Sequence, residues 1–347
     1  MSDKRFCLDL NSEDIKAWCK EAGVPSFRAD QIYKWISSGV INTSDMTNIP
    51  KDLRAKLEED FIFNSFEVIA SFESKIDGTR KFVYRLSDDN VIETVVMRYK
   101  TGLSVCISSQ AGCKMGCDFC ASAKLGFGRS LTSGELLAQV VLSQRLMGER
   151  IRSVVVMGIG EPFDNYDNLI GFIKLATDPQ GLNLGARHIT ISTCGIIPKI
   201  EEFTKLSSQV NLAISLHSPD DELRKKIMPI ARRYPLKDLI DSCRAYTVKT
   251  HRRITFEYSL FEGVNDSDAH ARALAKLLGG MLCNVNLIAA NEFPGSDYRR
   301  PSKDRVARFK QILTEHGINA TLRREMGTDI MAACGQLRRS TVEGGKS

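Results

Sequence analysis

Three cysteines lie close together in one short segment of the chain, at Cys113, Cys117 and Cys120. Structural zinc sites and ferredoxin-type iron–sulfur clusters use four protein ligands, yet no second C-x2-C pair follows, and the next histidine is His188. Three thiolates on a cubane cluster leave one iron without a protein ligand, so a small molecule can bind that iron directly. The C-x3-C-x2-C spacing therefore favours a cluster with an open iron over incidental thiols or a zinc site completed from elsewhere.

The residues after about position 100 alternate between strand and helix patterns. Amphipathic helical stretches separate apolar runs rich in β-branched residues, and Thr132 with Glu135 matches a capping box at the start of one helix. Strand-then-helix units of this kind predict an α/β fold, a partial (βα)6 barrel similar to a TIM barrel, with helices outside. A last, weaker strand is expected at 319–323. The main expected strands are 103–108, 153–158, 188–193, 211–216, 254–260 and 285–290.

Small and polar residues follow the ends of several expected strands. The second strand runs into GIGEP (158–162), the third into STCG (192–195) and the fourth into SLHSP (215–219), and the sixth runs into NEFPG (291–295). Ligands of such barrels bind at the carboxyl ends of the strands. We therefore expect these segments and the cysteine loop to meet at one rim.

The N-terminal part of the chain has a different pattern of apolar and polar residues. Short amphipathic helices are expected first, one capped by Asn11 or Ser12 and one beginning at Pro50. Alternating apolar and polar residues then predict an antiparallel β-meander that links this helical domain to the barrel. A tail follows the barrel. The expected boundaries are 1–64 for the helical domain, 65–98 for the meander, 99–325 for the core barrel and 326–347 for the tail.

Composition narrows the class of protein. Of the 347 residues, 43% are hydrophobic and 26% are charged, as in soluble globular proteins. There is no apolar run long enough to span a membrane and no signal peptide pattern at the start, so we expect a cytoplasmic protein without a membrane partner. In that reducing compartment, ten cysteines indicate metal or redox chemistry rather than a disulfide framework.

The net charge of +6 is modest, but the basic residues are clustered. Such clusters are either solvated ends of loops and helices or contacts to a polyanion, for which nucleic acid is the expected partner. The clusters are Arg224-Lys225-Lys226, Arg232-Arg233, Arg252-Arg253, Arg299-Arg300, Arg323-Arg324 and Arg338-Arg339.

The cysteine motif, with Phe119 before its last cysteine and a barrel behind it, resembles that of the radical S-adenosylmethionine (radical SAM) superfamily. The resemblance implies a [4Fe-4S] cluster on Cys113, Cys117 and Cys120, with the amine and carboxylate of SAM on the open iron. It also implies that Glu161 accepts the SAM amino group. The other implied SAM contacts are Gly160, Ser192, Ser215, Leu216, His217 and Asn291.

Longer segments resemble one family within that superfamily, the RlmN family of bacterial RNA adenine C2 methyltransferases. These segments include CISSQAGCKMGCDFCA, MGIGEPFDNYDN, SLHSPDDELRKKIMPI, AACGQL and the N-terminal FRADQIYKWI, so the resemblance spans nearly the entire chain. It implies an RNA-binding N-terminal domain and methylation of an adenosine in 23S rRNA, at the peptidyl-transferase centre, and of the adenosine beside the anticodon in tRNA. Four residues near the expected pocket depart from the family pattern: Ala231, Ala289, Ala290 and Met331.

Adenine C2 lies between two ring nitrogens and is electron-poor, so it does not attack a sulfonium methyl group, whereas a carbon radical can add to it. The resemblance implies that Cys334 accepts a methyl group from one SAM and that a second SAM provides the radical. Cys106 would then form a transient disulfide with Cys334, and Glu93 would accept a proton. A flavodoxin- or ferredoxin-type electron donor and a monomeric enzyme are also expected.

Several alternatives stay open on the sequence alone. The nearest is a Cfr-type enzyme that methylates C8 of the same rRNA adenosine. Others are a radical SAM enzyme with a different substrate and an RNA-binding iron–sulfur or zinc protein without catalysis. Taken singly, Glu93 fits a strand-face carboxylate, Cys334 a small buried hydrophobe and His217 a core histidine. Five cysteines are expected to be structural: Cys7, Cys19, Cys194, Cys243 and Cys283.

Overall fold

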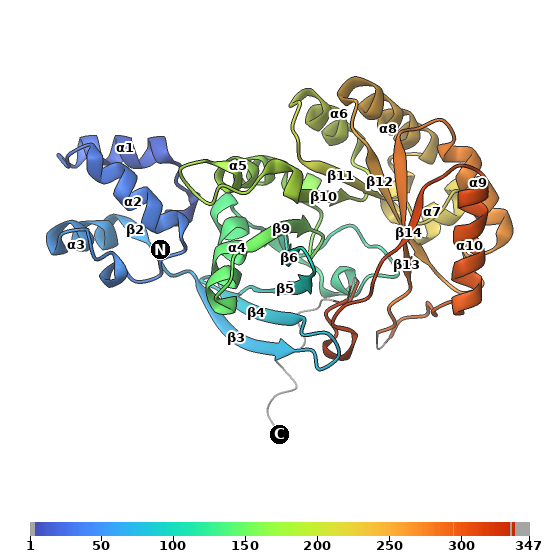
Figure 1. The fold of residues 1–347 in the computed structure, drawn as a ribbon, viewed down its shortest axis with the longest axis horizontal. Coiled ribbons are helices and arrows are strands. Elements are labelled where there is room, and N and C mark those ends of the chain that lie inside the picture. Colours follow the sequence, from blue (N-terminus) through green and yellow to red (C-terminus); the bar gives the residue numbers. More distant parts are fainter. Residues whose placement is uncertain (1–3, 294, 334, 337–347) are drawn as a thin grey trace.

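A single ten-stranded sheet forms the centre of the molecule (Figure 1). The computed structural model describes residues 4–293, 295–333 and 335–336. Along the sheet the strands follow the order β14-β13-β12-β11-β10-β9-β6-β5-β4-β3. Within the described ranges, no helix is long and apolar enough to cross a membrane.

Strand β6 and strands β9 to β14 are all parallel and form the predicted partial barrel. Every expected strand is present, with its ends shifted by no more than two residues. Apolar runs make these strands because both faces are covered, and β6 is buried along nearly its whole length. The strands are β6 (Gly102–Ile107), β9 (Ile151–Val156), β10 (Ile189–Thr193), β11 (Asn211–Ser215), β12 (Ile254–Leu260), β13 (Cys283–Ala289) and β14 (Ala320–Leu322).

Helices cover the outside of the barrel strands (Figure 1). The predicted capping box is present at the first of them, where the Thr132 hydroxyl accepts from the Glu135 amide and the Glu135 carboxylate accepts from the Thr132 amide. The helices are α4 (Ser133–Met147), α5 (Tyr166–Thr177), α6 (Ile197–Lys205), α7 (Asp221–Ile227), α8 (Leu236–Thr250), α9 (Asp268–Leu278) and α10 (Lys303–Glu315).

The predicted antiparallel meander consists of β3 (Phe66–Glu73), β4 (Arg80–Leu86) and β5 (Val91–Tyr99). It is not a separate layer, because β5 pairs antiparallel with β6 and so extends the barrel sheet. In this pairing Val95 lies opposite Cys106, which brings the inner faces of the meander and the barrel together.

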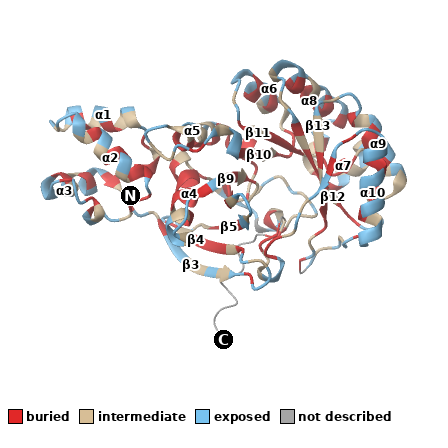
Figure 2. Ribbon diagram, in the orientation of Figure 1, coloured by how far each residue is buried: buried red, intermediate tan, exposed pale blue. Residues whose placement is uncertain are grey.

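The N-terminal helices lie at one end of the molecule, beyond the meander (Figure 1). They are α1 (Ser12–Glu21), α2 (Phe27–Ser37) and α3 (Lys51–Asp60), and a short parallel pair, β1 (Arg5–Phe6) and β2 (Phe61–Ile62), joins the two ends of this part. Asn11 caps α1 with a capping box, and Pro50 precedes α3 as expected. Buried residues run without a break from these helices into the barrel (Figure 2).

Gln139 on α4 fixes the start of the cysteine loop. Its side-chain oxygen accepts hydrogen bonds from the Ser108 amide at 2.8 Å and the Thr94 hydroxyl at 2.9 Å, and its nitrogen donates to the Ser108 carbonyl at 2.9 Å. These groups are buried, and a buried amide side chain with both ends satisfied holds its neighbours rigidly. The chain therefore leaves β6 in a fixed direction.

Candidate functional site

A small hairpin closes the base of the cysteine loop. Its strands are β7 (Gln110–Gly112) and β8 (Phe127–Ser130), which pair antiparallel, and the Cys113 amide donates to the Gly126 carbonyl at 2.9 Å. Gly112 has a φ of +83°, and a side chain there would clash with the Gly126 carbonyl oxygen. Glycine is therefore required for the two strands to meet this closely.

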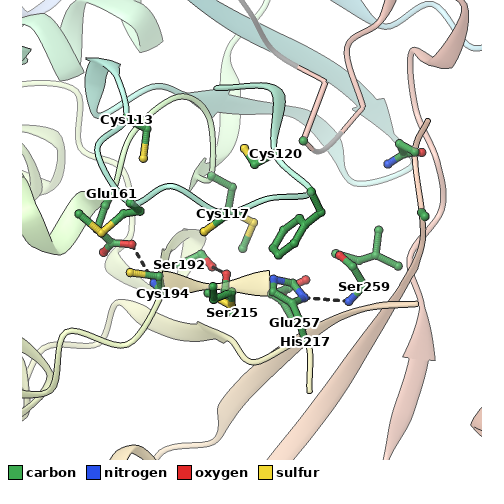
Figure 3. A pocket seen from close by; sticks show the side chains of 18 of the residues that line it. Cys113, Cys117, Cys120, Glu161, Ser192, Cys194, Ser215, His217, Glu257 and Ser259 are labelled. Atoms are coloured by element: carbon green, nitrogen blue, oxygen red, sulfur yellow. Dashed lines mark hydrogen bonds between the residues drawn. The ribbon is translucent and has the colours of Figure 1, made fainter. Parts of the chain in front are cut away.

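The three thiols of the loop face one cavity at the carboxyl ends of the barrel strands (Figure 3). Burial, together with the nearby Cys120, raises the pKa of Cys113 to about 12. Burial and then the other two cysteines raise the pKa of Cys117 well above its usual value. Three thiolates this close to one another need a compensating positive charge, as a bound metal centre provides.

The cavity has room for more than a metal centre. Its lining extends from the cysteine loop across the ends of β9, β10, β11, β12 and β13. All but one of the expected SAM contacts line it. Those that do are Gly160, Glu161, Ser192, Ser215, His217 and Asn291. The exception, Leu216, is buried, and its amide donates to the Glu257 carbonyl at 3.0 Å.

Glu161 is buried at the end of β9, where two backbone amides hold its carboxylate. The Phe163 amide donates to one oxygen at 2.9 Å and the Cys194 amide donates to the other at 2.8 Å. Burial raises the pKa of this carboxyl above its usual value, although the amides favour the charged form. The two bonds fix the orientation of the carboxylate at the edge of the cavity (Figure 3).

His217 points its ring into the cavity in a defined protonation state. The Ser259 amide donates to Nδ1 at 2.9 Å, so the neutral ring carries its proton on Nε2. Burial, and then the nearby Arg224, lowers the pKa of His217 to about 3. The ring lies edge-on to Phe119, with 4.8 Å between their centroids. His217 is therefore a neutral hydrogen-bond donor beside the cysteine loop.

Arg224 is fully buried below the cysteine loop, although the sequence placed it in a basic cluster for a polyanion. It donates to the carbonyls of Cys194 at 2.7 Å, Leu216 at 3.2 Å and Ser215 at 3.3 Å, and so joins the ends of β10 and β11. Its charge favours the thiolate forms of Cys117 and Cys194. The sequence carried a signal for this position, since Arg224 lies one helical turn before the apolar Ile227.

A polar set in the middle of the barrel was not predicted from the sequence. Asn286 donates to Glu257 at 2.9 Å, and Arg323 lies 4.0 Å from the same carboxylate oxygen. Cys194, expected to be structural, lines the cavity as well. For Glu257 and Asn286, the available signal was a polar residue at an inward position of a barrel strand, β12 or β13.

Cys106 lies in a second, smaller cavity that shares a wall with the first. Val95, Met97 and the C-terminal residues Ala332 and Ala333 also line it. The shared wall consists of Met157, Ile288, Asn291 and Arg323, which line both cavities. Cys334, the expected methyl carrier, lies outside the described residues.

Glu93 and Lys81 form a buried ion pair beside this second cavity. The Lys81 nitrogen lies 3.6 Å from the Glu93 carboxylate, and their side chains are 2% and 0% exposed. Lys81 lies opposite Val95 in the sheet, and Glu93 is two residues before Val95, so both side chains are on the same face as Cys106. The strand register thus places Glu93 and Cys106 on one face of the sheet, on neighbouring strands.

The four residues that depart from the family pattern lie around these cavities. Ala231, Ala289 and Ala290 are buried, and Ala290 lines the first cavity. The carbonyl of Met331 accepts from Lys81 at 3.4 Å.

Comparisons with known proteins agree with this geometry. Residues 107–275 match the model of the radical SAM superfamily, and residues 7–62 match that of the ribosomal RNA large subunit methyltransferase N-terminal domain. A protein of Clostridium botulinum named "Probable dual-specificity RNA methyltransferase RlmN" is 53% identical over 336 residues, 97% of each chain. A protein of the same name from Clostridium perfringens is 52% identical over 337 residues, again 97% of each chain.

A solved structure supports the same assignment. The crystal structure of a radical SAM methyltransferase from Sphaerobacter thermophilus superposes with a TM-score of 0.93 and 43% identity, over 96% of this chain and 99% of that one. The resemblance inferred from the motifs is thereby confirmed, and with it the [4Fe-4S] cluster and SAM as cofactors of this enzyme class. The chain belongs to the RlmN family of radical SAM methyltransferases.

Proposed function

We propose that this RNA methyltransferase makes 2-methyladenosine in 23S rRNA and in tRNA beside the anticodon. One observation carries the proposal: Cys106 lies in a cavity that shares a wall with the cavity of the cysteine loop, beside the residues that lead to Cys334. Methylation of an electron-poor ring carbon through a protein thioether needs two thiols next to a radical source. The names of the Clostridium relatives, which specify dual-specificity RNA methylation, support the choice of substrate.

The cavity wall with Cys113, Cys117 and Cys120 would hold the cluster and orient SAM. When bound, the cluster and SAM supply a carbon-centred radical. Glu161, held by two amides, is suited to accept the amino group of SAM. His217 is suited to donate from Nε2. A flavodoxin- or ferredoxin-type protein would supply the electrons, and a monomer suffices because one chain provides every group in the scheme.

The wall with Cys106 would complete the reaction. Cys334 carries the methyl-derived carbon to the adenine, which leaves the base joined to the enzyme through a thioether. Glu93 would accept the proton from C2 as the adduct radical loses one electron to the flavodoxin- or ferredoxin-type carrier, and its partner Lys81 compensates its buried charge. The Cys106 thiolate then bonds to the Cys334 sulfur as the bond between that sulfur and carbon breaks. The electron pair of the broken bond stays with the carbon, which takes up a proton to become the methyl group, and the two cysteines are left as a disulfide.

Two cysteine variants test this proposal. Cys106→Ala should trap the enzyme on a tRNA transcript, because the thioether forms but no thiol remains to attack Cys334. The adduct should survive a denaturing gel with thiol and vanish after nuclease treatment. Cys334→Ala should form no adduct, because the carrier is missing.

Cys283→Ala is the matched control, since Cys283 lines neither cavity. It should turn over like the unsubstituted enzyme. Normal turnover by Cys106→Ala, or an adduct with Cys334→Ala, would overturn the two-thiol scheme. Mass spectrometry of nucleosides from the product, against 2-methyl and 8-methyl standards, separates C2 from C8 methylation. Only the 2-methyl product agrees with the proposal.

A further inference from the structure

We propose that the turn between β3 and β4 is a positioning element for the chain that carries Cys334. The inference rests on the proposed function, because it assigns a purpose to that thiol. Figure 1 shows the segment after β14, in the darkest red, lying beside this turn, although some 250 residues separate them in the sequence. Separate anchors hold the described residues before and after position 334.

Two carboxylates form the upstream anchor. The Ser74 hydroxyl donates to one oxygen of Asp329 at 2.6 Å, and the Lys75 amide donates to the other at 3.0 Å. A third hydrogen bond has its donor on the C-terminal segment: the Gly327 amide donates to the Asp77 carboxylate at 2.9 Å. The hydrogen bond from Ser74 lowers the pKa of Asp329, so the anchor is complete at neutral pH.

The anchored residues form a tight turn of defined shape. The Ala332 amide donates to the Gly327 carbonyl at 2.9 Å, which closes the turn. Gly327 has a φ of +64°, and a side chain there would meet Ala332 and Thr79, both at 2.9 Å. The turn is thus fitted against Thr79, in the β3–β4 turn, and it places Ala332 and Ala333 in the wall of the cavity that contains Cys106.

The downstream anchor belongs to the barrel. The Ala121 amide donates to the Gly335 carbonyl at 2.9 Å, and Ala121 directly follows Cys120. Gln336 donates to the Glu292 carbonyl at 2.8 Å and accepts from the Ala333 amide at 3.2 Å. The described residues on the two sides of position 334 are therefore held to the meander on one side and to the cysteine loop on the other.

This arrangement explains why the meander is needed by a reaction centred in the barrel. A thiol that must meet SAM, then the base, then Cys106 has to stay within reach of all three. Misplacement by about 1 Å can cost about 100-fold in rate. Asp329 itself is exposed, whereas Ser74 and Gly327 are buried, so loss of the Asp329 carboxylate should disturb position more than folding.

Asp329→Ala in the iron-loaded holoenzyme tests the inference. It removes both acceptors of the Ser74 and Lys75 donors, and loss of two such bonds should speed hydrogen exchange of residues 326–336 about tenfold or more. With a tRNA transcript as substrate, more deoxyadenosine should be released from SAM per methyl group transferred. Iron content should not change. Asp329→Asn keeps one acceptor oxygen and should recover part of both effects.

Asp241→Ala is the control, because Asp241 is another exposed carboxylate with one hydrogen-bond partner, Lys237, on the far side of the barrel. It should leave both readouts unchanged. Unchanged exchange in Asp329→Ala would overturn the anchor, and faster exchange with an unchanged product ratio would overturn its positioning role. The exchange measurement needs no RNA, so failure of the anchor is distinguishable from failure of the proposed reaction.

Discussion

The cavity wall with Cys113, Cys117 and Cys120 is built from loops that follow neighbouring strands, whereas the wall with Cys106 is built from distant segments. The first wall consists of the loops that follow β6, β9, β10 and β11. The second combines β5, β6 and the residues after β14. We call them the cluster wall and the thiol wall.

The two walls also handle buried charge differently. In the cluster wall, Arg224 is buried among backbone carbonyls and His217 is kept neutral. Beside the thiol wall, Lys81 and Glu93 form a buried ion pair. A cation among carbonyls leaves its charge available to nearby thiolates, whereas an ion pair is compensated locally. The cluster wall thus suits a site that gathers negative charge, and the thiol wall suits proton transfer.

The largest expected effect is on iron content, which should differ between a variant in the cluster wall and a variant in the thiol wall. Cys117→Ala should lose the cluster, so that anaerobically purified protein falls from about four iron atoms per chain to nearly none. Cys106→Ala should keep its iron, because Cys106 belongs to the thiol wall. Iron analysis and the visible absorption spectrum of both variants check this. Loss of iron from Cys106→Ala as well would contradict the division into two walls.

A smaller effect is expected from Glu93→Gln. The variant should keep its iron and still cleave SAM, but formation of methylated RNA should slow by about 100-fold or more, the usual contribution of a general base. Single-turnover assays with a tRNA transcript measure both products.

Glu93→Gln leaves Lys81 buried without its counter-charge, which by itself destabilises the fold. The double variant Lys81→Met/Glu93→Gln removes both charges and should regain stability. If turnover returned together with stability, Glu93 would be a structural residue of the thiol wall and not its base.

The smallest effect concerns the pH dependence of the cluster wall. Burial holds the pKa of His217 near 3, against 6.5 for the exposed side chain, so below pH 6.5 the unfolded chain binds a proton that the folded chain does not. The free energy of unfolding should therefore decrease as the pH falls. His217→Asn, whose side-chain oxygen can accept from Ser259, should lose about 2 kcal/mol less than the unsubstituted protein between pH 7 and pH 5.

Urea unfolding of the cluster-free proteins measures this difference without interference from an acid-sensitive metal centre. Equal pH dependence in the two proteins would mean that His217 is accessible to protons in the folded state. The cluster wall would then be wetter than its burial indicates.

Much of the cluster wall was predictable because the patterns that specify it lie within short stretches of sequence. The cysteine spacing, the β-branched runs and the small residues after each run fix both the strands and the loop ends, and parallel strands bring those ends to one rim. The cap at Thr132 was also predicted correctly, and Asn11 is the one of the two expected caps, Asn11 or Ser12, that the structure shows, since a cap depends on only a few neighbouring residues. Arg224 was the main residue predicted wrongly. Its charge indicated an exposed position, but it lies on the buried face of its helix.

The thiol wall could not be predicted in this way. Its residues were named from a family resemblance, and nothing in their spacing connects Cys106 with Glu93 or with the anchor at Asp329. The pairing of β5 with β6 makes the first connection, and hydrogen bonds from Ser74 and Lys75 make the second. Strand register and long-range side-chain bonds are properties of the folded chain, because they depend on which segments meet and not on any one segment.

By itself the sequence determined the class of fold, the loop for the metal centre and the rim where the polar residues gather, because short-range periodicity and spacing encode them. Only the tertiary structure decided that the meander extends the barrel sheet, that Lys81 pairs with Glu93 inside it, and that the β3–β4 turn holds the C-terminal segment. The physical reason is packing: a buried charge or an anchored segment is stable only where the whole fold supplies its partners.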